Sequence, residues 1–439
     1  MTSDNNGQVM AYKRSRYNIF VPYGENTILF NPFSGAIGVI NPETLERLKT
    51  DRCSPEEIEL LLKKGVYIPE DFDEWEKMAK DRAEGIRDAS SKYVRIWTTS
   101  MCNAKCFYCY EKGIKPIPMT KETADAAVLF IKGMLTRNDT LYVEWFGGEP
   151  LLNQNIITYI MDQLAPYAAT MNIRIESKII TNGSLITDET ADLMAGKWNT
   201  KMVQVTLDGM QSTYNHVKNY ADPIRNNFDS VISNIHRLTK RDIRVAIRMN
   251  YDGENYESLS ALIDYISEEF SGEKHVYCYV YPLWDCLNRD DNERFRSNVS
   301  ADDNYILLIR QLVKKGMGDI KDLARLNYRK NQCRSCNEAG YSIFPDGTIG
   351  KCSETYIQRI GDIWRGVTDY ETEEVWISTD VDEDCRHCKL MPLCQGGCRS
   401  SKFTDMPRCY VNKPVLLKLL KLYVETLQAS GTPKEMPKQ

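Results

Sequence analysis

The sequence predicts an α/β protein with a parallel sheet, preceded by a small module and followed by a cysteine-rich region. Between about Tyr93 and Asp290, six strand-like runs alternate with segments of helix length, which is the pattern of βα repeats. Before them, short strands of alternating polarity surround turn residues. After them, the stretch 333–409 is rich in loop residues and contains eight cysteines. These three observations divide the chain into 1–90, 91–310 and 311–439.

The N-terminal part is expected to form a winged-helix-like module. Short strands are predicted near 18–21, 27–30 and 36–40, separated by Gly, Asn and Pro. A helix is predicted from Pro55, because Ser54 can cap it, Glu57 completes a capping box and Gly65 follows its end. A charged helix from about Asp71 to Arg87 would then link the module to the sheet.

The central part is expected to form an open parallel sheet or a partial (β/α)6 barrel. Its six strand-like runs are 93–99, 141–146, 173–181, 202–207, 243–250 and 275–281. In such folds, functional residues lie just after the carboxyl ends of the strands. A closing helix is predicted over about 414–428, after the cysteine-rich stretch and within the part 311–439.

The composition of the chain argues against several classes of function and favours others. A net charge of -5 and a pI near 5.7 argue against nucleic acid as a partner. No run approaches the ~18 apolar residues of a membrane span, and the first twenty residues lack a signal-peptide core. We therefore expect a cytoplasmic protein without a membrane partner. In a reducing compartment, fourteen cysteines indicate metal binding or catalysis rather than disulfides.

The first cysteine group is Cys102-x3-Cys106-x2-Cys109, directly after the first predicted strand. Three thiolates can hold three irons of a 4Fe-4S cluster and leave the fourth iron open. A zinc site short of one ligand, or buried free cysteines, are the alternatives. Residues 101–110 resemble the signature of the radical S-adenosylmethionine (SAM) superfamily. That resemblance implies that SAM binds the open iron and yields a 5′-deoxyadenosyl radical, which takes a hydrogen atom from the substrate.

Further motifs at later strand ends agree with this resemblance. The run 147–150 resembles the family's Gly-Gly-Glu-Pro motif, and 205–209 resembles its ribose-contacting segment. The resemblance implies SAM contacts from these residues and from the fifth strand end: Tyr108, Gly147, Gly148, Glu149, Thr206, Asp208, Arg248 and Asn250. An ordinary turn or a solvated strand end is the alternative interpretation.

The C-terminal cysteines resemble the seven-cysteine SPASM domain of radical SAM maturases, in spacing and order, with Cys333 as an eighth thiol. Eight thiolates suffice for two fully ligated 4Fe-4S clusters. Family connectivity implies one auxiliary cluster on Cys333, Cys336, Cys352 and Cys398, and a second on Cys385, Cys388, Cys394 and Cys409. The chain would then carry three clusters. Two zinc sites are the alternative.

The N-terminal module resembles the peptide-recognition (RRE) domain of maturases of ribosomally made peptides (RiPPs). The resemblance implies a precursor peptide whose leader adds a strand to the module, and a flavodoxin- or ferredoxin-type one-electron reductant. We expect a side-chain cross-link, either carbon–carbon, as in streptide-type lysine–tryptophan cyclases, or thioether. Candidates for a catalytic base near strand ends are Glu144, Asp285, Asp290 and Tyr279.

Three other functions stay open. The first is an anaerobic sulfatase maturase, although such relatives place an aspartate where this chain has Ser353. The second is a non-catalytic scaffold with structural metals, and the third is an electron-transfer protein. A module that only supports the barrel is likewise an alternative to the peptide-recognition domain.

Overall fold

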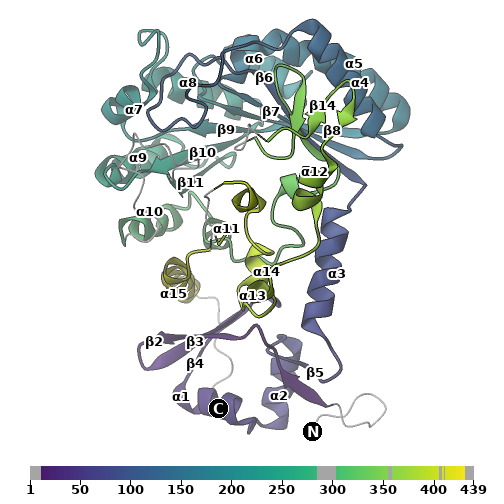
Figure 1. Ribbon diagram of the computed structural model, residues 1–439. Helices are drawn as coiled ribbons and strands as arrows, with labels where there is room; N and C mark the ends of the chain where they lie inside the picture. Colours follow the sequence, from purple (N-terminus) through teal and green to yellow (C-terminus); the bar gives the residue numbers. More distant parts are fainter. Residues whose placement is uncertain (1–10, 284–302, 354–357, 405–407, 410, 431–439) are drawn as a thin grey trace.

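The computed structural model describes residues 11–283, 303–353, 358–404, 408–409 and 411–430. Its main feature is a sheet in which ten strands lie in the order β11-β10-β9-β8-β7-β6-β12-β13-β14-β15. The first six of these are parallel and follow one another in the chain (Figure 1). They are β6 (Ser91–Thr99), β7 (Thr140–Gly147), β8 (Arg174–Thr181), β9 (Thr200–Thr206), β10 (Arg244–Tyr251) and β11 (Val276–Pro282). The predicted α/β class is confirmed, and each of the six strand-like runs is a strand.

The two faces of this sheet differ in chemistry. Apolar side chains such as Val94, Val143 and Ile179 are buried in the main hydrophobic core together with residues of the crossover helices. Because side chains alternate along a strand, the neighbouring positions Arg95, Glu144 and Lys178 project from the opposite face. The helices are α4 (Lys121–Met134), α5 (Gln154–Met171), α6 (Asp188–Ala195), α7 (Gln211–Lys218), α8 (Phe228–Thr239) and α9 (Tyr256–Glu269).

Four short strands of the cysteine-rich part extend the sheet beyond β6. They are β12 (Gly340–Ile343), β13 (Thr348–Gly350), β14 (Gly361–Asp362) and β15 (Gly366–Val367). β12 pairs in parallel with β6, and the others follow as antiparallel neighbours. The sequence predicted only loops here, because strands of two to four residues are too short to display a period.

The N-terminal module contains a three-stranded antiparallel sheet formed by β2 (Ile19–Tyr23), β3 (Asn26–Asn31) and β4 (Ala36–Ile40). Two helices follow, α1 (Pro42–Thr50) and α2 (Pro55–Lys63), and the capping box of Ser54 and Glu57 is present as predicted. β1 (Tyr12–Arg14) pairs with β5 (Tyr67–Pro69). The charged helix α3 (Glu74–Ile86) then leads into β6.

The C-terminal segment lies between the module and the main sheet (Figure 1). Its helices include α12 (Tyr370–Ile377), α13 (Glu383–Arg386), α14 (Met391–Cys394) and α15 (Lys413–Ala429). The Arg16 guanidinium donates to the carbonyl of Arg386 at 2.6 Å, and the Lys389 ammonium to the carbonyl of Asn18 at 2.8 Å. α10 (Asp303–Lys314) and α11 (Ile320–Leu323) complete the fold. No helix in the described ranges is long and apolar enough to cross a bilayer.

Candidate functional site

The three cysteines of the first group lie on the loop that follows β6. The Lys105 amide on this loop donates to the carbonyl of Lys218 at 2.8 Å, and Asn103 accepts from the Asn182 side chain at 2.8 Å. Burial, together with nearby charges that include the other thiols, raises the pKa of Cys102 and of Cys109 to about 12. The three thiols are therefore near enough to influence one another at the ends of the strands, although Cys102 is exposed and Cys106 and Cys109 are half-buried.

Two glycines at the end of β7 bring that strand against the cysteine loop. Gly147 has a φ of +128°, and a Cβ added there would lie 2.0 Å from the Thr99 carbonyl oxygen. A Cβ on Gly148 would lie 2.4 Å from the carbonyl oxygen of Met101. The backbone amides of Gly148 and Glu149 instead donate to these two carbonyls, at 3.1 and 2.8 Å. A side chain at either glycine would therefore displace the loop that carries Cys102.

Glu149 connects the glycine turn to the end of β8. Its carboxylate is fully buried and accepts from the Thr181 hydroxyl at 2.7 Å and from the amides of Asn182 and Leu151 at 2.8 and 3.1 Å. Burial raises the pKa of Glu149 to about 7, although these bonds act in the opposite direction. The carboxylate thereby organises the 181–183 loop, and its predicted contact with the SAM ammonium stays a prediction.

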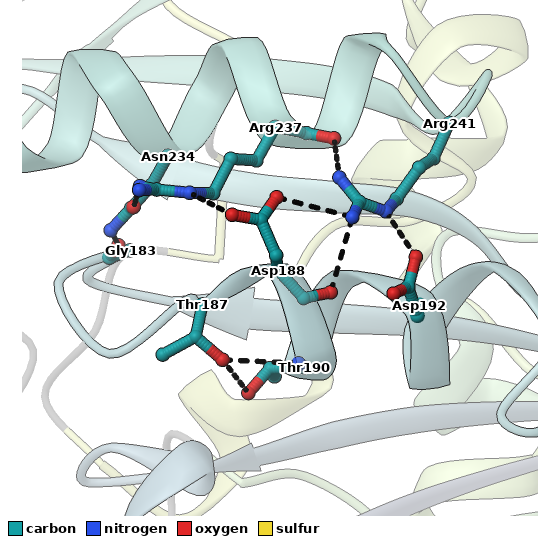
Figure 2. Close-up of polar contacts among 8 residues, drawn as sticks. All are labelled: Gly183, Thr187, Asp188, Thr190, Asp192, Asn234, Arg237 and Arg241. Carbon is teal, nitrogen blue, oxygen red and sulfur yellow. Dashed lines mark hydrogen bonds and ion pairs between the residues drawn. The ribbon is translucent and has the colours of Figure 1, made fainter.

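The 181–183 loop is supported from behind by a polar contact between α6 and α8 (Figure 2). The Asn234 side chain donates to the Gly183 carbonyl at 2.7 Å and itself accepts from Arg237. Asp188 forms ion pairs with Arg237 at 3.2 Å and with Arg241 at 3.1 Å. The crossover helices thus fix the loop whose amide and hydroxyl hold Glu149.

Four of the predicted SAM-contacting residues form one continuous network. The Asp208 carboxylate, directly after β9, accepts from the Tyr108 hydroxyl at 2.9 Å and from the Asn250 amide at 3.0 Å. Arg248 donates to the Asn250 side chain at 2.8 Å and stacks on the Tyr281 ring at 4.0 Å. Thr206 lies opposite Arg248 in the register of β9 and β10. The structure brings these residues together, and their contacts with SAM stay predictions.

Lys218 belongs to the same network, and the sequence analysis missed it. Its ammonium lies 2.9 Å from an Asp208 oxygen and 3.1 Å from the Tyr108 hydroxyl, and only 3% of its side chain is exposed. Burial opposes its charge, but the Asp208 carboxylate outweighs burial and raises the pKa of Lys218 well above its usual value. No sequence signal distinguishes this lysine from the solvated lysines that commonly end a helix.

Glu111, two residues beyond Cys109, is a second residue that sequence reasoning missed. Its Oε2 atom is buried and, within the described residues, has no hydrogen-bond partner. Burial and the nearby charge of Glu149 raise the pKa of Glu111 to about 8. Two carboxyl groups that are partly protonated at neutral pH therefore lie beside the three thiols, and a positively charged ligand, such as the sulfonium and ammonium groups of SAM, would favour their charged forms.

The two base candidates among the described residues, Glu144 and Tyr279, lie within their strands and not at these strand ends. Glu144 pairs with Arg95 and with Lys178 at 3.2 Å, and despite burial these cations lower its pKa to about 2, which makes it a weak base. Burial raises the pKa of Tyr279 to about 12, so this phenol is protonated at neutral pH. Asp285 and Asp290 lie outside the described residues. The Ser353 hydroxyl is buried and accepts from the Arg95 guanidinium.

The C-terminal cysteines form two neighbourhoods. The sulfurs of Cys333 and Cys336 are 3.9 Å apart, and the Cys336 thiol lowers the pKa of Cys333 to about 6. In the second neighbourhood, burial raises the pKa of Cys394 to about 11, with smaller contributions from three further thiols of the same predicted cluster, Cys385, Cys388 and Cys409. Over the described residues, no three His, Cys, Asp or Glu side chains converge as a single-ion site.

Buried arginines fix the loops around these cysteines. Arg82 on α3 donates to the carbonyls of Gln395, Ser378 and Thr379, at 2.7, 3.0 and 3.1 Å. Arg399 donates to the carbonyls of Ser378 and Asp380, both at 2.8 Å. Burial and the charge of Arg399 lower the pKa of Arg82 to about 10, so it remains a cation at neutral pH.

Comparison with known proteins agrees with this geometry. Residues 97–266 match the model of the Radical SAM superfamily. The match spans β6 to α9 and includes the three-cysteine loop and the Glu149 and Asp208 networks. The fold and this match show that the chain contains a radical SAM domain, and enzymes of this superfamily reductively cleave SAM.

Particular relatives extend the similarity beyond that domain. The Fe-coproporphyrin III synthase of Methanosarcina barkeri (strain Fusaro / DSM 804) is 22% identical over 371 residues, which is 73% of this chain and 88% of the relative. A cysteine-type anaerobic sulfatase-maturating enzyme of Clostridium novyi (strain NT) is 23% identical over 340 residues, covering 70% and 88%.

Two solved structures resemble the fold. The anSMEcpe structure with bound AdoMet has a TM-score of 0.57 at 17% identity, covering 77% of this chain and 94% of its own. Streptococcus suis SuiB bound to the precursor peptide SuiA has a TM-score of 0.52 at 14% identity, covering 92% of this chain and 100% of its own. At such identities, the similarity establishes the fold.

Proposed function

We propose that this enzyme forms an intramolecular side-chain cross-link in a ribosomally synthesised precursor peptide. One observation carries the proposal: the radical SAM site is embedded in a chain of which 92% follows the fold of SuiB, a protein solved with a precursor peptide. Because 92% coverage leaves fewer residues than the N-terminal module contains, the similarity extends into at least part of that module, which the reductive cleavage of SAM alone does not require. A carbon–carbon bond, such as lysine to tryptophan, and a thioether are the two cross-links considered.

The proposed cofactor site uses the residues at the strand ends. Cys102, Cys106 and Cys109 would hold the SAM-binding cluster, and the Asp208 network and the buried carboxylates would hold SAM. When bound, this pair supplies the electron and the hydrogen-abstracting radical. The chain orients SAM and excludes water. We further propose auxiliary clusters on Cys333, Cys336, Cys352 and Cys398, and on Cys385, Cys388, Cys394 and Cys409.

The proposed leader-binding edge is β4 of the N-terminal module. In the described residues, β4 pairs only with β3 and contains neither proline nor a charged residue. The opposite edge, β2, contains Pro22, and its Tyr23 hydroxyl bonds to Gln428 on α15 at 3.3 Å. Because an open strand edge accepts a further strand through its backbone groups, β4 is the edge that suits an extended peptide.

The activity test uses anaerobically reconstituted full-length enzyme, SAM, a chemical reductant and the peptide encoded beside the gene. The expected results are 5′-deoxyadenosine and a peptide lighter by two hydrogen masses, with fragment ions missing between the joined residues. An unchanged peptide mass, with SAM cleaved, would contradict the proposed cross-link.

The leader site is tested by Val39→Pro, which removes one backbone donor from β4, with Glu25→Ala in the β2–β3 turn as control. We expect weaker precursor binding in Val39→Pro and unchanged SAM binding in both variants. Deleting residues 1–90 is a poorer test, because it also removes Arg82, which holds the cysteine-rich loops. Equal precursor binding by Val39→Pro and the control would argue against β4.

A sulfatase-maturase-like dehydrogenation is the second candidate function, and the similarity to the sulfatase-maturating enzyme and to anSMEcpe favours it. Ser353 counts against it, because a hydroxyl bonded to Arg95 cannot replace the aspartate base expected of that class. An aldehyde-reactive hydrazide distinguishes the two functions: it labels a formylglycine product and leaves a cross-linked peptide unlabelled.

A further inference from the structure

We propose that Lys218 is a positioning residue whose buried ammonium sets the reduction potential of the cluster on Cys102, Cys106 and Cys109. The inference rests on the proposed cofactor site, and it adds a residue that no motif marked. Lys218 is the last residue of α7, and its ammonium lies inside the protein, next to the loop that carries the three thiols.

Lys218 is held on all sides. Its ammonium contacts Asp208 at 2.9 Å and the Tyr108 hydroxyl at 3.1 Å, and it lies 5.8 and 5.6 Å from the ring centres of Tyr108 and Tyr214. Tyr214 in turn bonds to Tyr220 at 2.8 Å. The Asp208 side chain is only 2% exposed, so water does not screen the pair.

The backbone ties this cation to the cysteine loop. The Lys218 carbonyl accepts from the Lys105 amide at 2.8 Å, and the Asn103 carbonyl accepts from the Ala221 amide at 2.9 Å. These two bonds bracket the stretch between Cys102 and Cys106. Because Tyr108 lies between Cys106 and Cys109 in sequence, its hydroxyl brings the Lys218–Asp208 pair to the second half of the loop as well.

Charge determines the direction of the effect. Reducing a cluster adds one electron, delivered by an external one-electron donor, and raises the negative charge near the thiolates. A fixed positive charge nearby stabilises the reduced form, and a fixed negative charge destabilises it. Lys218 and Asp208 therefore act in opposite directions, and the intact pair keeps the site close to neutral. Removing either member should shift the potential with opposite sign.

The experiment measures the midpoint potential of this cluster in reconstituted full-length enzyme without SAM, by EPR-monitored redox titration. The signal of the Cys102→Ala/Cys106→Ala/Cys109→Ala variant is subtracted to remove other clusters. Lys218→Met should lower the potential and Asp208→Asn should raise it, each by about 59 mV, which for one electron is a tenfold change in the ratio of reduced to oxidised cluster at fixed potential. Lys218→Arg and Lys218→Met/Asp208→Asn should stay near the unchanged enzyme.

The opposite signs separate this role from a structural one. A lysine needed only to neutralise Asp208 would give loss of iron in Lys218→Met, but no ordered shifts among the variants that retain iron. If Lys218→Met loses its cluster, comparing Asp208→Asn with the double variant gives the same sign test. Shifts of one sign, or none, overturn the inference alone. A wild-type enzyme without a signal that depends on the three cysteines overturns the proposed cofactor site and this inference together.

Discussion

The two cysteine regions of this enzyme, 102–109 and 333–409, are surrounded by different kinds of side chain. The thiols after β6 lie among ionisable side chains, with the Lys218–Asp208 pair near Cys106, and with Glu111 and Glu149 near Cys102. The C-terminal thiols lie among loops whose carbonyls are bound by Arg82 and Arg399. Under the proposed function, the charges of the first region act on a reacting centre, whereas the arginines of the second region keep irregular loops in place.

The difference follows from where each region lies in the fold. The first group occupies a strand-end loop, where side chains from β8, β9 and β10 converge because parallel strands end at one edge. The second group lies on segments that have little regular structure of their own, so many backbone carbonyls need donors from elsewhere. An arginine supplies up to five donors from one rigid group, which suits that task.

Removing one thiol from each region should give the largest difference in SAM cleavage and in peptide product. We expect Cys106→Ala to abolish SAM cleavage, since the SAM-binding iron would be lost, and Cys394→Ala to retain cleavage while blocking peptide product. Chromatographic measurement of 5′-deoxyadenosine and mass spectrometry of the peptide report the two outcomes. Cys53→Ala is the matched control, because Cys53 belongs to no cysteine group. Full cleavage in Cys106→Ala would invalidate the contrast.

The stability of the loops in the second region should depend on Arg82, which lies far away in the sequence. Arg82→Leu leaves the carbonyls of Gln395 and Thr379 without this donor, whereas Ser378 keeps its bond from Arg399, and we expect a loss of about 4 kcal/mol in the free energy of unfolding. Iron associated with the C-terminal cysteines should fall with it. Thermal unfolding and iron analysis measure both effects. Arg87→Leu, at a largely exposed position after the same helix, should change neither.

The sequence predicted the regular parts of the fold well. β6 to β11 were found as strand-like runs that alternate with segments of helix length, and α2 from its capping residues, because these signals are local. β12 to β15 were missed, since two to four residues carry no period and their pairing with β6 depends on residues far away in the chain.

The candidate site was predicted only where a motif marked it. The cysteines, Glu149 and Asp208 stand in recognisable spacings, whereas Lys218, Glu111 and Arg82 look like ordinary surface charges. Their importance arises from burial, which is a property of packing and not of local sequence. Glu144 illustrates the converse: its place near a strand end suggested a base, but the flanking Arg95 and Lys178 lower its pKa to about 2.

The ion pairs of Glu144 should also make the free energy of unfolding depend on pH in the acid range. The arginine-supported loops should not contribute to this dependence. The folded pKa of Glu144 lies near 2, below its usual 4.5, so the unfolded chain binds more protons between these values. Glu144 thus contributes about 3 kcal/mol above pH 4.5, and this contribution is lost as the pH falls towards 2. The free energy of unfolding, measured with denaturant between pH 5 and 2.5, should depend less on pH in Glu144→Gln than in the unchanged enzyme. An unchanged slope would mean that the pair forms equally in the unfolded chain.

The smallest expected effect concerns the ligand that the first region is built to receive. Within the described part of the chain, Glu111 has one carboxyl oxygen without a hydrogen-bond partner, and because its pKa is about 8, this carboxyl would become charged when a cation binds beside it. Glu111→Gln keeps the shape and removes the charge, and we expect SAM to bind about tenfold more weakly, or about 1.4 kcal/mol. Calorimetric titration of reconstituted enzyme with SAM, without reductant, measures this independently of turnover. Glu122→Gln, on the exposed first turn of α4, is the control. If Glu111→Gln and Glu122→Gln bind SAM with equal affinity, Glu149 alone is the negative counter-charge for SAM. The first cysteine region would then differ less from the second in the charges that act on its ligand.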